Sequence, residues 1–452
     1  MIETEKNTLE KSNAWRKPCK TPSLQENFQT IPVSSSWAWW HKMFAFAGPG
    51  YLVAVGYMDP GNWATDLAAG SAFNYSLLSI VLLSNLMAIL LQHLAGKLGI
   101  VTGRDLAQAC RDNFSFPVTI ILWILCEIAI CACDLAEIIG SAIALKLLFN
   151  LPLIWGVCIT ALDVFVLLYF QKLHFRYIEA LVIILMSIIA GCFWFEIAMA
   201  RPNIGSIMAG FIPHIDILCN QEMLYLAIGI IGATVMPHNL YLHSSIVQTR
   251  KYADDIAGKS EAIKFITLDT TIALTLAFFI NAAILIVAAS VFYAHGYKGI
   301  TEIEDAYRLL TPLIQVPLAS TLFALALLAS GQNSTLTGTL AGQIVMEGFL
   351  DIQLPPLLRR LLTRGIAIIP AICCVFLYGE TGVAKLLLVS QVILSFQLGF
   401  AIIPLIMFTS DRKKMGPLVN APWVTILASI SACLIIGLNI KYLVDFFVSH
   451  IL

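Results

Sequence analysis

Charged residues are scarce in this sequence. Of its 452 residues only 12% are Asp, Glu, Lys or Arg, whereas 59% are hydrophobic. Soluble domains carry about 25% charged residues, so the composition excludes a soluble globular protein and indicates a polytopic membrane protein within a lipid bilayer. The net charge is −1 and the sequence has no basic cluster, so we expect no nucleic-acid partner. No obligate protein partner is evident either.

The motifs of enzymes are also missing. We find no nucleophile paired with a base, no phosphate-binding loop and no redox motif. His238 and His243 are five residues apart with no Glu between them, which excludes the HExxH motif of zinc hydrolases. We therefore expect a transporter without a resident cofactor.

The eleven cysteines are scattered, and most lie in apolar segments. They imply no disulfide framework. Cys131 and Cys133 resemble a ligand pair, but a spacing of two places them on different faces of a helix. We interpret them as small residues that pack helices together.

Long apolar segments are abundant. A membrane-spanning helix needs about 20 apolar residues, and the sequence predicts eleven spans, at residues 43–72, 76–97, 117–145, 153–170, 177–199, 222–247, 265–292, 317–346, 362–378, 383–408 and 422–447. With the N-terminus inside, 21 of the 27 Lys and Arg residues lie in cytoplasmic segments and none lies deep in a span. This bias predicts a cytoplasmic N-terminus and an external C-terminus.

Four segments follow from this count. Residues 1–42 form a polar tail without a signal peptide, which we expect to be cytoplasmic and mostly disordered. Residues 43–200 form a first set of five spans and residues 220–410 a second set. Residues 420–448 form the eleventh span.

Two of the predicted spans are interrupted in the same way. Met58-Asp59-Pro60-Gly61-Asn62-Trp63 breaks the first, and Val235-Met236-Pro237-His238-Asn239 breaks the sixth. Proline removes a backbone donor and ends a helix. The two breaks are 177 residues and five spans apart, so the second set enters the membrane from the opposite side. This indicates an inverted repeat with the substrate site where the broken helices meet.

The residues at these breaks suit a transition metal ion. Asp59 supplies a carboxylate, Asn62 an amide oxygen and Met236 a thioether, and the breaks free the carbonyls of Gly56 and Ala233. Mg²⁺ and Ca²⁺ require oxygen ligands, whereas a thioether suits transition metals. The alternative functions are helix capping for Asp59 and simple packing for Met236.

Three further acids lie on one face of the third span. Glu127, Asp134 and Glu137 are 7 and 10 residues apart, which places them within roughly 80° on a helix. They either bind protons or form structural ion pairs. The candidate basic partners are Arg250, Arg359 and Arg360. Other buried polar residues suit gating or interhelical hydrogen bonds better than metal ligation, namely Asp269, Asn281, Gln332 and Asn333.

Three motifs in order resemble the Nramp family of proton-coupled manganese and iron transporters, and most closely its bacterial manganese members. They are Asp59-Pro60-Gly61-Asn62, Met236-Pro237-His238-Asn239 and the run from Gly331 to Gln343, and the likeness extends over residues 44–412. The resemblance implies an all-α, LeuT-like 5+5 fold and uptake of Mn²⁺ or Fe²⁺ with H⁺ across a bacterial inner membrane. One departure is Gly399, where the family usually has proline.

The resemblance also assigns roles to single residues. It implies metal ligation by Asp59, Asn62, Met236 and the Ala233 carbonyl, with Gln391 closing on the ion in occluded states. It further implies a proton route through the residues that match Asp134 and Glu137, with His238 beside the metal. A lone histidine is equally often a structural hydrogen-bonding group, and that alternative stays open for His238.

Two other functions compete with metal symport. A symporter of an organic amine or amino acid would share the fold, but its broken helix commonly presents glycines and free amides rather than Asp and Met. A passive metal channel would share the ligands but would ignore a pH gradient.

Overall fold

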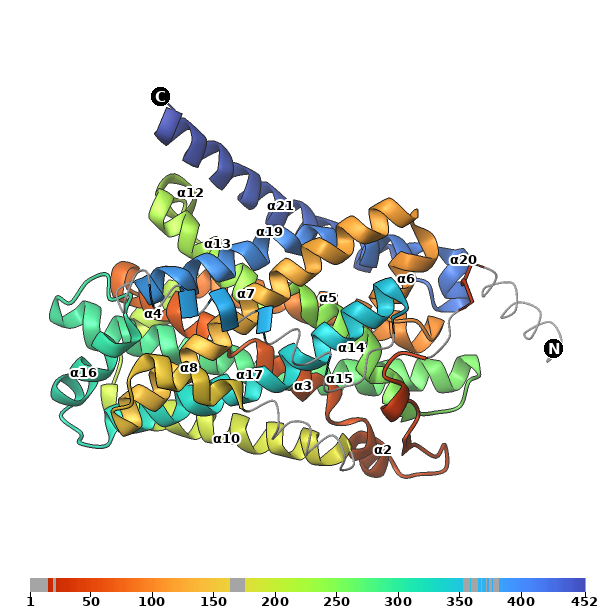
Figure 1. Ribbon diagram of the computed structural model, residues 1–452, viewed down its shortest axis with the longest axis horizontal. Coiled ribbons are helices and arrows are strands. Elements are labelled where there is room, and N and C mark those ends of the chain that lie inside the picture. The colour runs from red at the N-terminus through yellow and green to blue at the C-terminus, as the bar shows by residue number, and fades with distance from the viewer. Residues whose placement is uncertain are drawn as a thin grey trace.

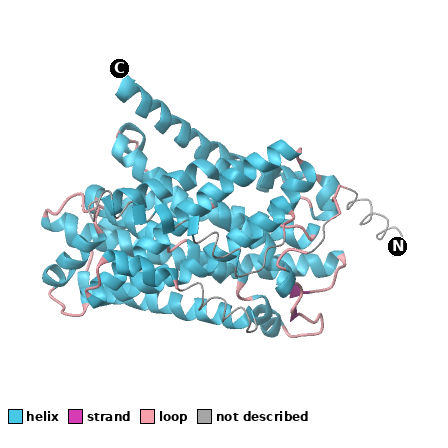
Figure 2. Ribbon diagram, in the orientation of Figure 1, coloured by secondary structure: helices cyan, strands magenta, loops and turns pink. Residues whose placement is uncertain are grey.

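The computed structural model describes residues 15–18, 22–162, 175–352 and 382–451, together with positions 358, 365, 366, 368–370, 372, 373 and 376. In these residues the chain is almost entirely helical (Figure 2). The α-helices are α2 (Trp39–Phe46), α3 (Pro49–Gly56), α4 (Pro60–Phe73), α5 (Leu78–Thr102), α6 (Leu106–Asn113), α7 (Phe116–Phe149), α8 (Leu153–Ala161), α10 (Phe175–Ala200), α11 (Ile204–Gly210), α12 (Asp216–Cys219), α13 (Gln221–Val235), α14 (Pro237–Ile246), α15 (Ile256–Val287), α16 (Ile303–Ile314), α17 (Ala319–Leu350), α19 (Val383–Ser410), α20 (Arg412–Met415) and α21 (Pro422–Ile451).

The shorter elements lie at the ends of the long helices. The strands are β1 (Ile31–Pro32) and β2 (Arg250–Lys251), the 3₁₀ helices are η1 (Gln25–Asn27), η2 (Val247–Thr249), η4 (Tyr293–His295) and η6 (Gly416–Leu418), and η3 (Ala288–Phe292) is a π-helix.

The long helices lie roughly along one axis and form a bundle, with α21 leaving it at an angle (Figure 1). Seven of the described helical segments are long and apolar enough to cross a membrane. Most of the predicted ninth span, and residues 163–170 of the fourth, lie outside the described residues. The count of eleven spans and the division into domains stay predictions.

The first break separates α3 from α4. Helix α3 ends at Gly56 and α4 begins with Pro60 at its first position, where proline costs no hydrogen bond because that N–H has no helical partner. The Asp59 side chain caps α4 by accepting a hydrogen bond from Asn62 N. The sequence thus ends one helix and starts the next within three residues.

The second break separates α13 from α14 at Met236. Pro237 is the first residue of α14, and Met236 has a φ of +36°. A side chain in this left-handed region is disfavoured, so its presence marks a backbone held in place by its surroundings. The interrupted helix pairs contact each other, because Tyr57 Oη donates to the Val235 carbonyl over 3.4 Å.

Small residues allow α17 to pack closely against α7. A Cβ atom added to Gly331 would clash with Ser141 Oγ, so the glycine favours this close approach. Helix α19 continues through Gly399 without interruption. The glycine therefore introduces no break where proline was expected.

The N-terminal segment is more ordered than the sequence suggests. Strand β1 pairs in parallel with β2, and Ile31 lies opposite Arg250. Ser23 Oγ lies 2.6 Å from Ser245 Oγ, and Leu24 is buried. The expected disorder of residues 1–42 therefore does not extend to residues 22–42, which pack against the end of α14.

Candidate functional site

The site begins at the first turn of α4. Asp59 is fully buried, and its Oδ1 accepts hydrogen bonds of 2.8 Å from both the backbone N and the Nδ2 of Asn62. The break produces this arrangement, because a residue in the capping position turns its side chain toward the free N–H groups of the new helix. Capping by Asp59, one alternative from the sequence, is therefore present.

The amide nitrogen of Asn62 lies among three oxygen atoms. Besides Asp59 Oδ1, Nδ2 donates to the Ala233 carbonyl over 3.0 Å and to the Gly56 carbonyl over 3.4 Å. These two carbonyls are available because each belongs to the last turn before a break. Carbonyl and carboxylate oxygens from both broken helices thus converge on one point.

Met236 lies beside this point. Its Sδ would be 3.2 Å from a Cβ atom built on Gly56, and it is 3.6 Å from Asn239 Nδ2. Met236 is fully buried in a small cluster with Ala132, Cys133 and Leu394. The structure therefore brings together five of the six predicted ligands, namely Asp59, Asn62, Met236, Gly56 and Ala233.

Two buried amides border the site. Gln391 of α19 lies over Gly61, where an added Cβ would clash with its Nε2, and its Oε1 has no hydrogen-bond partner among the described residues. Asn281 of α15 donates to the Tyr57 carbonyl over 2.7 Å and to Asn62 Oδ1 over 3.3 Å. Asn281 thus orients the amide of Asn62 and helps to join α15 to the break.

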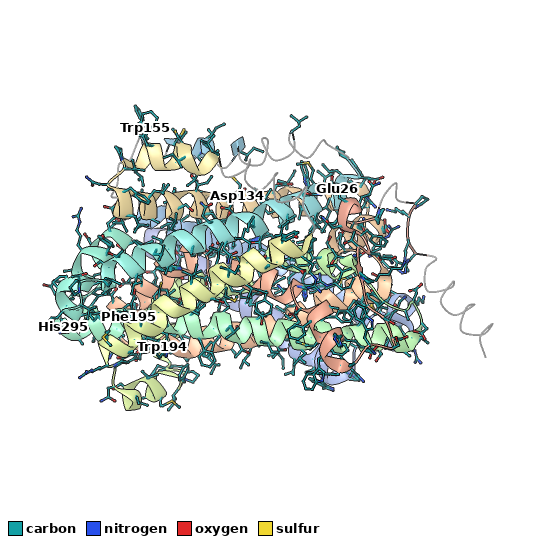
Figure 3. All side chains as sticks on the ribbon, turned by 90° about the horizontal axis from the view of Figure 1, so that it is seen from below. Glu26, Asp134, Trp155, Trp194, Phe195 and His295 are labelled. Atoms are coloured by element: carbon teal, nitrogen blue, oxygen red, sulfur yellow. The ribbon has the colours of Figure 1, made fainter. Side chains whose placement is uncertain are left out.

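The acidic face of α7 leads away from the site. A Cβ atom on Gly338 would lie 2.8 Å from Asp134 Oδ1 and 3.0 Å from Glu137 Oε1, so these two side chains meet at one glycine of α17. Asp134 and Glu127 also line a cavity of about 550 Å³, and Glu127 accepts a hydrogen bond from Trp123 Nε1. Figure 3 shows Asp134 midway along the bundle.

Sequence reasoning missed Cys133. Its Sγ lies 3.6 Å from Glu137 Oε1 and 4.0 Å from Asp59 Oδ2, so it connects the acidic face to the site. The interpretation as a packing residue is incomplete. The spacing contained a signal, because Cys133 lies four residues before Glu137 and hence on the same helix face.

Arg250 does not pair with the acidic face of α7, and that prediction is wrong. Its buried guanidinium forms an ion pair of 2.7 Å with Glu179 of α10 and donates to the carbonyls of Ala45 and Ala47. Arg250 lies in β2, four residues beyond the end of α14, so packing there, rather than charge alone, determines its partner. Arg359 and Arg360 lie outside the described residues.

Two other predicted polar residues are buried. His238 lies in the first turn of α14, two residues after Met236, and its Nδ1 has no partner. Asp269 accepts hydrogen bonds from Gly48 N and Gly50 N, which suits the interhelical role expected for it. It joins α15 to the start of α3.

The chemistry of the site is mixed. Among the described residues no group of three or more His, Cys, Asp and Glu side chains suits a metal ion. The convergent atoms are instead one carboxylate, an amide, two carbonyls and a thioether. Such a set can attract a dication, and its sulfur favours transition metals over Mg²⁺ and Ca²⁺.

Comparison with known proteins gives consistent results. A family model described as Nramp, natural resistance-associated macrophage protein-like, matches residues 50–445. A divalent metal cation transporter, MntH, of Nostoc sp. is 62% identical over 422 residues, which are 93% of this chain and 96% of the relative.

Solved structures show the same relationship. The chain resembles a manganese transporter of Eremococcus coleocola with a TM-score of 0.85 and 41% identity, covering 94% of this chain and 90% of that one. Mhp1, a nucleobase-cation-symport-1 family transporter, matches with a TM-score of 0.61 at 14% identity, over 97% and 94% of the chains. The second match shows the LeuT-like fold alone.

Proposed function

Because the chain belongs to the Nramp family, we propose that it takes up divalent transition metal ions, Mn²⁺ and Fe²⁺ among them, together with protons by alternating access. The related proteins are transporters, and the fold is that of a LeuT-like membrane transporter rather than an enzyme. The metal ion is the substrate and not a resident cofactor.

The observation that supports this proposal best is the position of the Asn62 amide. An amide NH₂ group surrounded by a carboxylate and two carbonyls occupies a point where the potential favours positive charge. A dication would interact with the same three oxygens more strongly than the amide NH₂ group does, because it carries a full double charge. Rotation of the side-chain amide would then turn Asn62 Oδ1 toward the ion, adding a further oxygen ligand.

The thioether of Met236 accounts for selectivity. Sulfur contributes little to Ca²⁺ or Mg²⁺, which prefer six or more oxygen ligands, but it binds softer transition metals. The site has few oxygens and excludes bulk water, because Asp59, Asn62 and Met236 are all buried. A hard cation would thus lose hydration without adequate replacement.

We expect Met236→Ala to keep part of the Mn²⁺ uptake but to admit Ca²⁺ as a competitor. Loss of the sulfur leaves oxygen ligands and space for water, which suits Ca²⁺. The measurement is Mn²⁺ uptake into proteoliposomes with rising external Ca²⁺. Met223→Ala, a buried methionine on the same broken helix pair, is the matched control. If Ca²⁺ remains excluded from the Met236 variant, the thioether is not the source of selectivity.

Proton coupling is supported by the polar groups that lead away from Asp59. Cys133 Sγ lies near both Asp59 and Glu137, Glu137 and Asp134 meet at Gly338, and Asp134 borders the cavity that also contains Glu127. Such a series can pass a proton as the ion leaves. The proton then restores charge balance near Asp59.

We expect Asp134→Asn to weaken the pH dependence of Mn²⁺ uptake more than the apparent Mn²⁺ affinity. The amide occupies the same space but binds no proton at physiological pH. In wild-type protein, uptake should rise as external pH falls, and the variant should lose most of that rise. Asp134→Glu, which keeps the carboxyl group, should restore it. Equal losses of affinity and pH dependence would count against a coupling role.

The orientation follows from the distribution of basic residues. We propose that the N-terminal segment and the end of α14 face the cytoplasm of a bacterial cell, with the C-terminus outside the inner membrane. The inward-negative potential then contributes about 2.3 kcal/mol per charge per 100 mV to entry of the ion. A divalent ion gains twice that amount.

The proposed function is tested by uptake into proteoliposomes with and without an imposed pH gradient. We expect Mn²⁺ to accumulate and the acid-outside gradient to stimulate its uptake. Uptake that ignores the gradient would indicate a passive channel. Binding of an amino acid with no binding of Mn²⁺ would indicate an organic substrate.

A further inference from the structure

One sulfur atom near the metal site has no role as a metal ligand in the function proposed above. Cys133 lies in the middle of α7, is fully buried, and packs in one cluster with Met236 of the second break and Leu394 of α19. Its Sγ is 4.0 Å from Asp59 Oδ2. Two sulfur atoms, a thioether and a thiol, therefore flank the site.

The orientation of Asp59 leaves an oxygen available on the Cys133 side. Oδ1 accepts both hydrogen bonds from Asn62, whereas Oδ2 faces the thiol. Metal bonds of about 2.3 Å to thiolate sulfur and about 2.0–2.2 Å to carboxylate oxygen together slightly exceed this S···O separation. One ion can thus bridge the two atoms without movement of either helix.

Neighbouring residues can accept the thiol proton and can contribute a further oxygen near the ion. Sγ lies 3.6 Å from Glu137 Oε1, so the proton displaced by a metal has an acceptor. Among the described residues Gln391 Oε1 is buried without a hydrogen-bond partner, and the amide that carries it lies over Gly61, two residues after Asp59. A buried oxygen without a described donor beside the break is a second feature that suits a bound cation.

We propose that Cys133 is a specificity-determining residue, whose sulfur becomes a ligand when a soft dication such as Cd²⁺ or Zn²⁺ occupies the site. The inference rests on the proposed function of the same site and adds a second sulfur to it. Mn²⁺, a harder ion, is held by the oxygens and the Met236 thioether and gains little from the thiol. The chain therefore discriminates among transition metals at α7 as well as at the two breaks.

The test is calorimetric binding of Cd²⁺ and of Mn²⁺ to the purified full chain, for wild type, Cys133→Ser and Cys126→Ser. Removal of outer-shell partners already lowers metal affinity about 10–100-fold, so loss of a direct ligand should weaken Cd²⁺ binding at least about tenfold. Mn²⁺ binding should change by less than about threefold. Cys126 is buried on the same helix, and its variant should match wild type for both ions.

A spectroscopic measurement on wild type alone can overturn the inference. Cd²⁺ bound to a thiolate produces an ultraviolet sulfur-to-metal charge-transfer band, which a thioether and oxygens do not. We expect this band in wild type and in Cys126→Ser, and its loss in Cys133→Ser. Absence of the band from Cd²⁺-loaded wild type, or an unchanged Cd²⁺ affinity in Cys133→Ser, would overturn the role of Cys133.

These outcomes are separable from a failure of the proposed function. If wild type binds Mn²⁺ but Cys133 does not affect Cd²⁺, only the inference about the second sulfur is wrong. If wild type binds neither ion, the proposed metal site fails, and the role of Cys133 fails with it.

Discussion

Replacing Asp59 with Ala abolishes Mn²⁺ uptake if the two breaks form the metal site. Within the part of the chain that the structure describes, Asp59 supplies the only carboxylate that is hydrogen-bonded to Asn62, and it is fully buried. Removing one partner from a buried charge pair costs about 3–5 kcal/mol, which corresponds to a loss of affinity of more than about a hundredfold. The amide and carbonyl dipoles that remain cannot balance a dication in a dry site.

The measurement is Mn²⁺ uptake and Mn²⁺ binding by the Asp59→Ala and Asp59→Asn variants. Asp59→Asn keeps the side-chain oxygen that caps α4 but removes the charge, so both variants should fail equally. Asp66→Asn, a change to a second buried carboxylate two turns further along α4, is the control and should retain uptake. Normal transport by either Asp59 variant would disprove the ligand assignment.

Replacing Arg250 with Ala should destabilise the protein by about 3–5 kcal/mol, because it leaves Glu179 as a buried charge without its main partner. The guanidinium and this carboxylate are 0% and 2% exposed and 2.7 Å apart. Arg250 also donates to the Ala45 and Ala47 carbonyls, just before α3. Loss of Arg250 therefore removes hydrogen bonds that hold the residues just before α3, and it also leaves the Glu179 carboxylate buried without its main partner.

The midpoint of thermal unfolding of the purified protein measures this effect. The double variant Arg250→Ala/Glu179→Ala should be more stable than Arg250→Ala alone, because no unpaired charge remains. Arg176 provides a comparison: it also contacts Glu179, at 3.1 Å, but its side chain is 37% exposed whereas that of Arg250 is fully buried, so water screens its charge and its loss should cost less. Equal losses for Arg176→Ala and Arg250→Ala would show that burial does not govern this pair.

The two helix breaks, at Asp59-Pro60 and at Met236-Pro237, were predictable because the effects of these residues are local. Proline cannot continue a helix, and an acid cannot remain in hydrocarbon without a partner. The positions of the breaks, the freed carbonyls of Gly56 and Ala233 and the nearby thioether all follow from neighbouring residues.

The partners of single side chains were harder to predict. Charge alone made Arg250 a candidate ion-pair partner for the acids of α7, Asp134 among them. In the structure Arg250, in β2, pairs with Glu179 of α10. Residues 22–42 belong to a segment expected to be mostly disordered, but backbone pairing of Ile31 with Arg250 gives this part a fixed place. Both outcomes depend on which helix ends lie side by side, and no local pattern contains that information.

The sequence by itself determined the membrane-protein class, the two breaks and the donor types Asp59, Asn62 and Met236, since hydrophobicity and backbone chemistry act within a few residues. Only the tertiary structure decided that Asn62 Nδ2 lies among three oxygens, that Cys133 faces Asp59 and that Arg250 forms an ion pair with Glu179. The physical reason is that the rotation of each helix about its own axis is set by packing against helices remote in the chain. The type of a residue determines which groups it can bind, whereas the rotation of its helix determines which of those groups it contacts.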